Sequence, residues 1–480
     1  MDTMTQEIML YNTLTRQKEK LQPQEDGVVR FYSCGQTVYD NVHVGNAKTY
    51  IVWDILVRAL RHFGYTVKHI QNFTDVGHLT DDADEGEDKI VKRAKLLKEH
   101  PMELVDRQIN DYYRDMDRIN IARPNLAPRA TAHITEMIDL VQTLLDNGHA
   151  YELDGSIYYD ISTFDDYGKL ARLDLENLKA GARIEVMEGK RNPGDFALWI
   201  KAPTEHIMKY SSPWGKGYPG WHLECSVMSM KYLGDTLDIH AGGIDHLPVH
   251  HTNEIAQSEG ATGKQFAKVW LHSEFITING EKMSKSKGNF VTLQELIEKL
   301  GEGPAKIALS KFHYRTQADF SWDTANSIRK RYFRLIRSYH IGLQTLVAQN
   351  QWKTNPDLSK SKIISGFERA LADDLNTPLA YTQIDTAAKR IDQAVKAKDV
   401  EKIQYHIAEF ELMMDVLGVT TITVSEEEVK HISGMVVERT NLRESGNLEL
   451  ADKIRNLLQF ENYVLQDQAD GSTVWYKEKQ

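Results

Sequence analysis

The chain has 480 residues, a formal net charge of -11 at pH 7 and two cysteines. This length exceeds what one hydrophobic core serves, so we expect about three or four domains. The negative charge excludes a wholly basic nucleic-acid binder but permits a local basic face, and the low cysteine count excludes a disulfide framework. The sequence has no long apolar run and no signal-peptide pattern at its N-terminus, so we expect a cytoplasmic protein without a membrane partner.

The first predicted elements surround one dense motif. A strand is predicted over 28–32, an amphipathic helix through 51–63 with a stop at Gly64, and a second strand over 67–73. The motif between the first strand and the helix reads Cys34-Gly35-Gln36-Thr37-Val38-Tyr39-Asp40-Asn41-Val42-His43-Val44-Gly45-Asn46. The end of a parallel strand and the start of its crossover helix form the usual ligand position of an open α/β sheet. We therefore predict a nucleotide phosphate at this helix start, with a simple helix cap as the alternative role for the histidine.

An acidic stretch at 81–88 follows the second strand. It lacks the ligand and glycine spacing of a calcium loop, so we interpret it as a solvated loop and assign it no function.

The remaining elements predict a mixed insertion within the sheet and a helical second half. Each is inferred from apolar periodicity and from Gly, Pro and Asn turn signals. They are a helix over 134–145, a hairpin turning at 154–155, a helix over 222–233, a strand over 236–240, a helix from Pro248 to Glu259 stopped by Gly260, a strand over 275–278, helices from 291 to 418, a helix over 451–458 and a strand over 463–465.

Four side chains in this pattern suit a metal ion. His250 and Glu254 stand one turn apart on one predicted helix, and Cys34 and Cys225 are the two cysteines of the chain. Two thiolates, an imidazole and a carboxylate form a credible zinc set. The alternative, that the cysteines are buried apolar groups and the His–Glu pair a helix-surface contact, stays open. His251 is a rival ligand, but it points about 100° away around the helix, so we favour His250.

Taken together, the motifs resemble the cysteinyl-tRNA synthetase family of class I aminoacyl-tRNA synthetases along nearly the whole chain. They occur in the family's order: the Cys34 motif through His43-Val44-Gly45-Asn46, Trp221-His222-Leu223-Glu224-Cys225, Asp238-Ile239-His240, Gly242-Gly243-Ile244-Asp245, His250-His251-Thr252-Asn253-Glu254 and Lys282-Met283-Ser284-Lys285-Ser286. One departure is Asn46, which replaces the second histidine of the family signature.

The resemblance implies an α/β fold, in which a class I synthetase Rossmann-like parallel sheet carries an inserted α+β domain and is followed by a helical domain and a small mixed C-terminal tail domain. We expect boundaries at 1–125 and 216–290 for the two halves of the catalytic domain, 126–215 for the insertion, 291–345 for a helical stem-contact region, 346–425 for a helical tRNA-binding domain and 426–480 for an anticodon-reading tail.

The implied activity is ATP-dependent formation of cysteinyl-adenylate and transfer of the cysteine to tRNA(Cys). By resemblance, His43, Gly45 and Asn46 bind the ATP phosphates, with Mg²⁺ accompanying ATP. Lys285, aided by Lys282, closes over the phosphates on a mobile loop, although a lysine-rich surface turn is the alternative interpretation. By resemblance, Gly243 and Asp245 lie at the adenosine, where Asp245 binds the ribose hydroxyls.

The resemblance also implies how cysteine is selected. One zinc ion per chain, on Cys34, Cys225, His250 and Glu254, would take the substrate sulfur as an extra ligand in a five-coordinate complex. A serine hydroxyl is a poorer ligand, so no editing site should be needed. The family residues that line this pocket correspond to Gly35, Thr37, Thr74 and Trp221, and the alternative for the tryptophan is a core aromatic.

The C-terminal part is expected to select the tRNA, and we expect the chain to act as a monomer. The tail residues Arg443, Asp452 and Asp467 resemble the family's anticodon-reading groups, since Arg and Asp can bond the edges of a guanine. Five basic residues on one predicted helix form a candidate phosphate track, with a solvated helix face as the alternative: Arg329, Lys330, Arg331, Arg334 and Arg337.

Two rival functions stay open from sequence. One is a related ligase that passes cysteine to an amino sugar, which should lack the helical and tail regions. The other is a catalytically inactive RNA-binding paralogue, against which His43, Lys285 and the candidate zinc ligands argue.

Overall fold

The computed structural model describes residues 7–79, 86–173, 189–204, 206–284, 288–468 and 471–478. The chain divides into two compact units. The first comprises Met1–Ile276, Met283–Leu293 and Tyr314–Ala318, and the second comprises Thr277–Lys282, Gln294–His313 and Asp319–Gln480. Within the described residues, no helix is long and apolar enough to cross a membrane.

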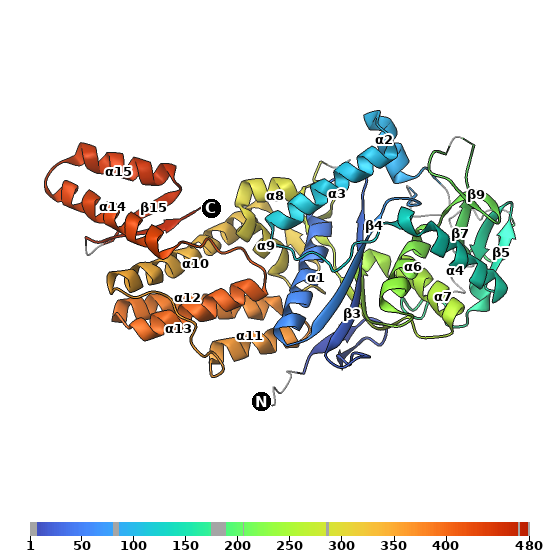
Figure 1. The fold of residues 1–480 in the computed structure, drawn as a ribbon, viewed down its shortest axis with the longest axis horizontal. Coiled ribbons are helices and arrows are strands. Elements are labelled where there is room, and N and C mark those ends of the chain that lie inside the picture. The colour runs from blue at the N-terminus through green and yellow to red at the C-terminus, as the bar shows by residue number, and fades with distance from the viewer. Residues whose placement is uncertain are drawn as a thin grey trace. The chain divides into compact units, whose positions relative to one another are not determined.

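A parallel four-stranded sheet forms the centre of the first unit (Figure 1). Its strand order is β11(Ala267–Ser273), β10(Leu237–Gly243), β3(Val28–Thr37), β4(Thr66–Thr74). The connection from β3 to β4 and the connection from β10 to β11 leave in opposite directions. The carboxyl ends of β3 and β10 are therefore neighbours at a topological switch point, the position where open α/β sheets bind ligands. The predicted parallel sheet is confirmed.

Helix α1(Val44–His62) connects β3 to β4 and begins where the sequence placed a phosphate-binding turn. It ends at the predicted stop, because Gly64 adopts a φ of 91°, a backbone conformation that is unfavourable for every residue with a side chain. On the other side of the switch point, α7(His250–Thr262) connects β10 to β11.

The predicted ends of α7 are wrong. The helix begins two residues after Pro248 and runs through Gly260 to Thr262, and Gly263, with a φ of 67°, ends it. Gly260 serves close packing instead, because a Cβ atom there would lie 2.8 Å from the hydroxyl oxygen of Tyr159. A glycine inside a helix and a glycine that ends it look alike in sequence.

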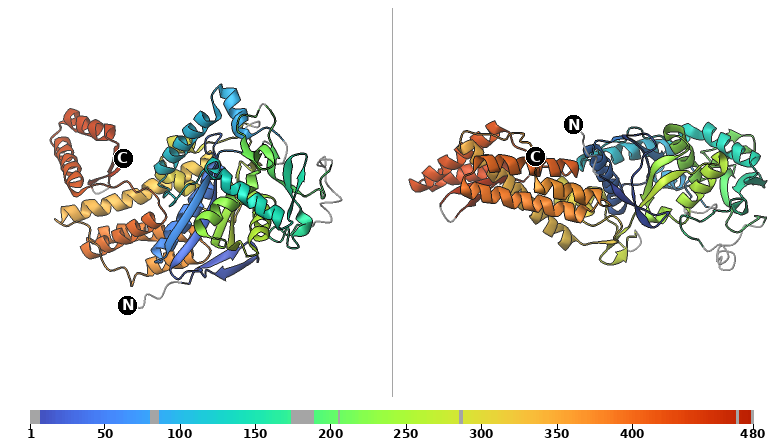
Figure 2. Two further views of the ribbon diagram at one scale, coloured as in Figure 1. Left: turned by 45° about the vertical axis from the view of Figure 1, so that its right-hand side comes forward. Right: turned by 90° about the horizontal axis from the view of Figure 1, so that it is seen from below.

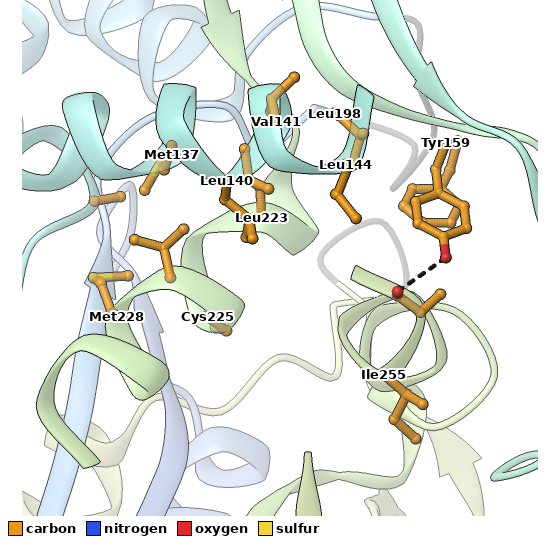
Figure 3. Packing of buried hydrophobic residues seen from close by; sticks show 14 of the residues in the cluster. Met137, Leu140, Val141, Leu144, Tyr159, Leu198, Leu223, Cys225, Met228 and Ile255 are labelled. Carbon is orange, nitrogen blue, oxygen red and sulfur yellow. Dashed lines mark hydrogen bonds between the residues drawn. The ribbon is translucent and has the colours of Figure 1, made fainter. Parts of the chain in front are cut away.

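The inserted part carries a five-stranded antiparallel sheet. Its strand order is β5(Ala150–Leu153), β6(Ser156–Tyr159), β7(Phe196–Lys201), β9(Gly215–Pro219), β8(Tyr210–Ser212). The hairpin predicted at 154–155 is confirmed, and both turn residues have positive φ. Apolar side chains of α4(Ile134–Asp146) pack against α6(Trp221–Leu233), and the hydroxyl of Tyr159 donates to the carbonyl of Ala256 in α7 (Figure 3). This packing connects the insertion to helices that surround the switch point.

The first unit contains several further elements. They are the hairpin β1(Met9–Asn12) and β2(Gln17–Lys20), helices α2(Lys89–Leu97) and α3(Pro101–Arg118), and the 3₁₀ turns η1(Ala130–His133), η2(Ile161–Thr163) and η3(Ile244–His246).

The second unit is mainly helical, as predicted for the stretch after 291. Figure 2 shows its long helices α10, α12 and α13 packed along one another. The elements of this part of the chain are β12(Ile276–Ile278), β13(Glu281–Lys282), α8(Leu293–Leu300), α9(Glu302–Ser310), β14(Ala318–Phe320), α10(Trp322–Ala348), α11(Lys362–Ala372), α12(Thr377–Ala397), α13(Val400–Val416), α14(Glu426–Glu444), α15(Leu448–Phe460), β15(Tyr463–Asp467) and β16(Thr473–Lys477).

The end of the acidic stretch has a structural role that the sequence interpretation missed. Residues 81–85 lie outside the described residues, but Asp88 is buried and caps α2. Its carboxylate accepts hydrogen bonds from the backbone N–H groups of Ile90 and Val91 and, from outside the helix, of Gly77. The interpretation of 81–88 as a solvated loop is therefore wrong at Asp88, because burial there is set by a tertiary contact with Gly77.

We expect Asp88→Ala to destabilise the first unit by roughly 1–3 kcal/mol, since it leaves buried backbone donors unsatisfied and removes a helix cap. Thermal denaturation should show a lowered Tm. The matched control is Glu87→Ala, because that exposed neighbour pairs with Lys95 at the surface. Equal Tm values for both variants would contradict the role of Asp88.

Candidate metal and nucleotide site

The four predicted metal ligands converge in the first unit. Cys34 comes from β3, Cys225 from α6, and His250 and Glu254 from adjacent turns of α7. Their candidate ligand atoms all lie within 4.8 Å of one another, and all four residues are buried. The residues are far apart in sequence, so their meeting depends on the position of β3 at the switch point and on the packing of α6 against α7. This arrangement can hold a metal ion.

A second group shares part of this set. Cys34 and Glu254 also lie within 4.8 Å of His240 and His251 when one ligand atom per residue is counted. The Nε2 atom of His251 is 3.2 Å from the Cys34 sulfur, so the angular argument against His251 as a ligand is wrong. The separation of about 100° on the helix is between the Cα–Cβ directions of His250 and His251. Both imidazole side chains are long enough to reach the Glu254 carboxylate one turn away. His250 Nε2 lies nearer to Glu254 Oε1, at 3.0 Å against 4.0 Å.

The electrostatics of the cluster favour a charged carboxylate and a charged imidazole. Burial opposes ionisation of Glu254, but His240 and His250 lower its pKa to about 2. Burial likewise opposes protonation of His250, but Glu254 and Cys225 raise its pKa to about 10. Burial raises the pKa of the Cys34 thiol. Burial also opposes ionisation of Cys225, but a hydrogen bond from Cys34 together with the charge and hydrogen bond of His250 lowers the pKa of Cys225. The cluster thus provides one thiol that ionises readily, as a thiolate ligand must.

Further histidines orient the ligands, and the sequence analysis did not identify them. His240 Nε2 lies 2.6 Å from Glu254 Oε2, and His222 Nδ1 lies 2.9 Å from His250 Nδ1. A partner on Nδ1 leaves the Nε2 of His250 directed at Glu254, which is the usual way that a second residue orients a metal-binding imidazole. His240 and His222 stand in the resembling motifs, but sequence gives no sign of which ring they contact.

The predicted substrate pocket adjoins this cluster. The ring of Trp221 stacks on His250 at 4.2 Å and on His78 at 4.0 Å between centroids. Thr37 and Thr74 are paired across β3 and β4, and the hydroxyl of Thr37 lies 2.8 Å from His78 Nδ1. The sequence analysis did not identify His78, because a histidine before an acidic insertion carries no pattern of its own.

Gly35 has a clear steric reason to be glycine. A Cβ atom there would lie 1.7 Å from the carbonyl oxygen of Asn72, and the Gly35 N–H donates to the Asn72 side chain. Gly35 therefore lets β3 and β4 approach closely just after Cys34.

The start of α1 presents His43 as the helix cap. Its Nδ1 accepts hydrogen bonds from the N–H groups of Gly45 and Asn46, at 3.1 and 3.3 Å. An imidazole whose Nδ1 accepts carries its proton on Nε2, so this atom remains a donor. The cap and the phosphate-binding role are therefore compatible, and His43, Gly45 and Asn46 are all only partly buried.

Residues that flank the predicted mobile loop lie against this helix start. The N–H of Val44 donates to the carbonyl of Val291, the N–H of Leu293 donates to the carbonyl of Val42, and the Phe290 ring contacts His43 edge to face. Lys285 lies outside the described residues, and Lys282 is exposed in β13.

The end of β10 carries the predicted adenosine residues. A Cβ atom at Gly243 would lie 2.3 Å from Asp245 Oδ1, so a side chain there would displace the Asp245 carboxylate. Asp245 is exposed in η3, directly after β10. Since β10 pairs with β3, Gly243 and the Cys34 motif lie at the same edge of the sheet.

In the second unit, two of the three predicted anticodon residues are brought together. The Arg443 guanidinium lies 2.9 Å from the Asp467 carboxylate. Hydrogen bonds from Arg439, Thr473 and Arg443 hold the pKa of Asp467 well below its usual range. Asp452 is exposed on α15.

The basic residues predicted on α10 are partly used inside the second unit. Arg331 pairs with Asp385 and Arg337 donates to Gln466, whereas Lys330 and Arg334 are exposed. The alternative interpretation as a solvated helix face thus holds only in part, because Arg331 and Arg337 support the packing of the second unit.

Comparison with known proteins agrees with this geometry. Residues 20–330 match the family of class I tRNA synthetase (C) catalytic domains, and residues 366–421 match the DALR domain family. The chain is 43% identical to the cysteine--tRNA ligase of Treponema denticola over 98% of this chain and 99% of that protein. It is 42% identical to the cysteine--tRNA ligase of Thermus thermophilus over 97% of this chain and 98% of that protein.

The fold has solved relatives. Mycobacterium tuberculosis methionyl-tRNA synthetase in complex with methionyl-adenylate matches with a TM-score of 0.58 and 16% identity, covering 81% of this chain and 89% of that one. At this identity the likeness concerns the fold alone. The near-full-length sequence matches go further: the chain belongs to the cysteine--tRNA ligase family of class I aminoacyl-tRNA synthetases.

Proposed function

We propose that the chain uses ATP to activate L-cysteine as cysteinyl-adenylate and then transfers the cysteine to the 3′ end of tRNA(Cys). The observation that carries this proposal is the position of the buried Cys34, Cys225, His250 and Glu254 group at the same sheet edge as the helix start capped by His43. A thiol-selective site and an anion-selective site thus adjoin, as the joining of cysteine to a nucleotide requires.

We infer that the buried group holds one zinc ion per chain. Two thiol sulfurs, an imidazole and a carboxylate suit a borderline-soft tetrahedral ion, and the set with Cys225 and His250 offers more sulfur than the one with His240 and His251. When bound, zinc supplies a site that takes a thiolate sulfur in preference to a hydroxyl oxygen, which separates cysteine from serine. Gly35, Thr37, Thr74 and Trp221 form the rest of the proposed pocket.

The chain's own residues act on the phosphates. The Nε2–H of His43 and the side-chain amide of Asn46 are suitable donors to a triphosphate, and these donors stabilise charge that develops as pyrophosphate leaves. Lys285 and Lys282 are proposed to add positive charge, and Mg²⁺ accompanies ATP in this scheme. Gly243 and Asp245 are proposed to bind the adenosine, with Asp245 accepting from the ribose hydroxyls.

The second unit is proposed to select tRNA(Cys) through Arg443, Asp452 and Asp467. Arg443 supports this role best, because it is half exposed while its partner Asp467 fixes its guanidinium. The helical region and tail that follow the catalytic part also disfavour the amino-sugar ligase as an alternative.

The donor set can be tested through the two cysteines. Cys34→Ser should abolish zinc binding under either set, whereas Cys225→Ser should abolish it only if the α6 thiol is a ligand, which we expect. Elemental analysis of metal-replete chains gives the zinc content per chain. Retention of zinc by Cys225→Ser together with its loss in Cys34→Ser would favour the set with His240 and His251.

The phosphate role of His43 can be separated from its capping role. His43→Asn keeps a side-chain helix cap but removes the Nε2 donor, so it should slow adenylate formation by roughly 10²-fold, as His43→Ala and Lys285→Ala also should. Cysteine-dependent ATP–pyrophosphate exchange is the measurement, and the KM for cysteine should change little. Recovery of the wild-type rate by His43→Asn would show that only the cap matters.

The tail is tested with Arg443→Ala, which should weaken charging of tRNA(Cys) by roughly tenfold or more while pyrophosphate exchange stays unchanged. Aminoacylation of wild-type and anticodon-swapped tRNA measures the preference. Lys396→Ala, an exposed charge removal on α12, is the control. An undiminished preference for the cysteine anticodon in Arg443→Ala would refute the role.

A further inference from the structure

His78 links a lysine to a hydroxyl of the proposed cysteine pocket. Its Nε2 lies 2.7 Å from the Lys89 ammonium nitrogen, and its Nδ1 lies 2.8 Å from the hydroxyl oxygen of Thr37. The ring is buried and stacks on Trp221, with an interplanar angle of 9°, and Trp221 in turn stacks on His250 of the metal group. Thr37 is therefore connected to His250 of the metal group through its hydrogen-bond partner His78 and the stacked ring of Trp221.

The contact with Lys89 fixes the position of the proton on His78. An ammonium group has only donors, so the Nε2 of His78 must act as the acceptor. A neutral imidazole that accepts through Nε2 carries its proton on Nδ1, and this Nδ1–H donates to the Thr37 oxygen. The single hydroxyl proton of Thr37 then cannot point at His78. Thr37 becomes a donor in another direction, and its side chain is only partly buried at the carboxyl end of β3.

Backbone contacts hold this pair of residues in register. The N–H of Lys89 donates to the carbonyl of His78 at 2.9 Å, and Leu79 and Asp88 form an isolated antiparallel bridge. The carboxylate of Asp88 also accepts from the N–H of Gly77 at 2.8 Å. These contacts hold Asp88 and Lys89 next to His78 and Leu79.

We propose that His78 is a positioning residue, which, with its proton fixed by Lys89, orients the Thr37 hydroxyl as a hydrogen-bond donor to a carboxylate oxygen of the bound cysteine. This inference rests on the proposed function, because it takes the group near Thr37 to be the amino-acid substrate. It also assigns roles to the last residue of the acidic stretch and to its neighbour: Asp88 holds this part of the chain at Gly77, and Lys89 selects the tautomer of His78.

The test uses the full chain with its metal and measures cysteine-dependent ATP–pyrophosphate exchange. His78→Phe keeps an aromatic ring for Trp221 but removes the N–H, so the KM for cysteine should rise about five- to tenfold while kcat and the KM for ATP stay nearly unchanged. Lys89→Met keeps His78 but no longer selects one tautomer, so the KM for cysteine should rise by a smaller factor, about two- to threefold. Lys92→Met, an exposed change of the same kind on α2, should have no effect.

A double-mutant cycle makes the test specific. Thr37→Val should raise the KM for cysteine, and adding His78→Phe to it should cause no further rise, because both changes remove the same hydrogen bond. Independent, multiplying effects of the two substitutions would overturn the inference, as would equal changes in the KM for ATP. Unchanged KM values for cysteine in His78→Phe and Lys89→Met would also overturn it while leaving the proposed function intact. A wild-type chain without cysteine-dependent exchange would instead overturn the proposed function.

Discussion

The burial of the Glu254 carboxylate is the constraint on which the site depends. Removing an ionised carboxylate from water costs several kcal/mol unless positive charge and hydrogen bonds compensate it. Here His240 Nε2 lies 2.6 Å from one carboxylate oxygen, and His250 Nε2 lies 3.0 Å from the other. These partners come from β10 and from α7, so the charge can be buried only where both elements meet. The thiol of Cys34 completes the group from the adjacent strand.

The sheet topology then joins this buried group to an anion site. Strand β3 carries Cys34 and Thr37, and the next element along the chain is α1, whose N-terminus is capped by His43. The paired strand β10 ends at Gly243, beside β3, because the two crossovers leave the switch point in opposite directions. The proposed sites for the substrate sulfur and for the phosphates thus lie together at one strand pairing, while α6 adds Cys225 and Trp221.

Much of this organisation follows from sequence patterns, because strand ends, glycine stops and i, i+4 pairs are local properties. Strands β3, β4 and β10 and helix α1 were predicted in this way, whereas the edge strand β11 was missed. Cys34, Cys225, His250 and Glu254 were correctly expected to meet. Tertiary contacts explain what was missed. The sequence does not show that Gly260, inside α7, packs against Tyr159. It also does not show that the imidazoles of His250 and His251 both reach the Glu254 carboxylate.

The acidic stretch is a second case in which tertiary contacts were missed. Its composition is typical of a solvated loop, yet Asp88 is buried because it caps α2 and binds Gly77, and Lys89 contacts His78. A high density of charged residues does not by itself show which of them face water and which are buried in tertiary contacts. His78 carried no sequence signal at all, since its partners Thr37 and Lys89 become neighbours only in the folded chain.

The central claim is that cysteine is recognised through a metal held by two protein sulfurs. X-ray absorption at the zinc edge, on the zinc-loaded chain with and without L-cysteine, tests this claim most directly because it counts the sulfur ligands. We predict two sulfur ligands in the free chain, a third when L-cysteine is added, and no change with L-serine. A single sulfur ligand in the free chain, or a sulfur count that L-cysteine does not change, would contradict the account.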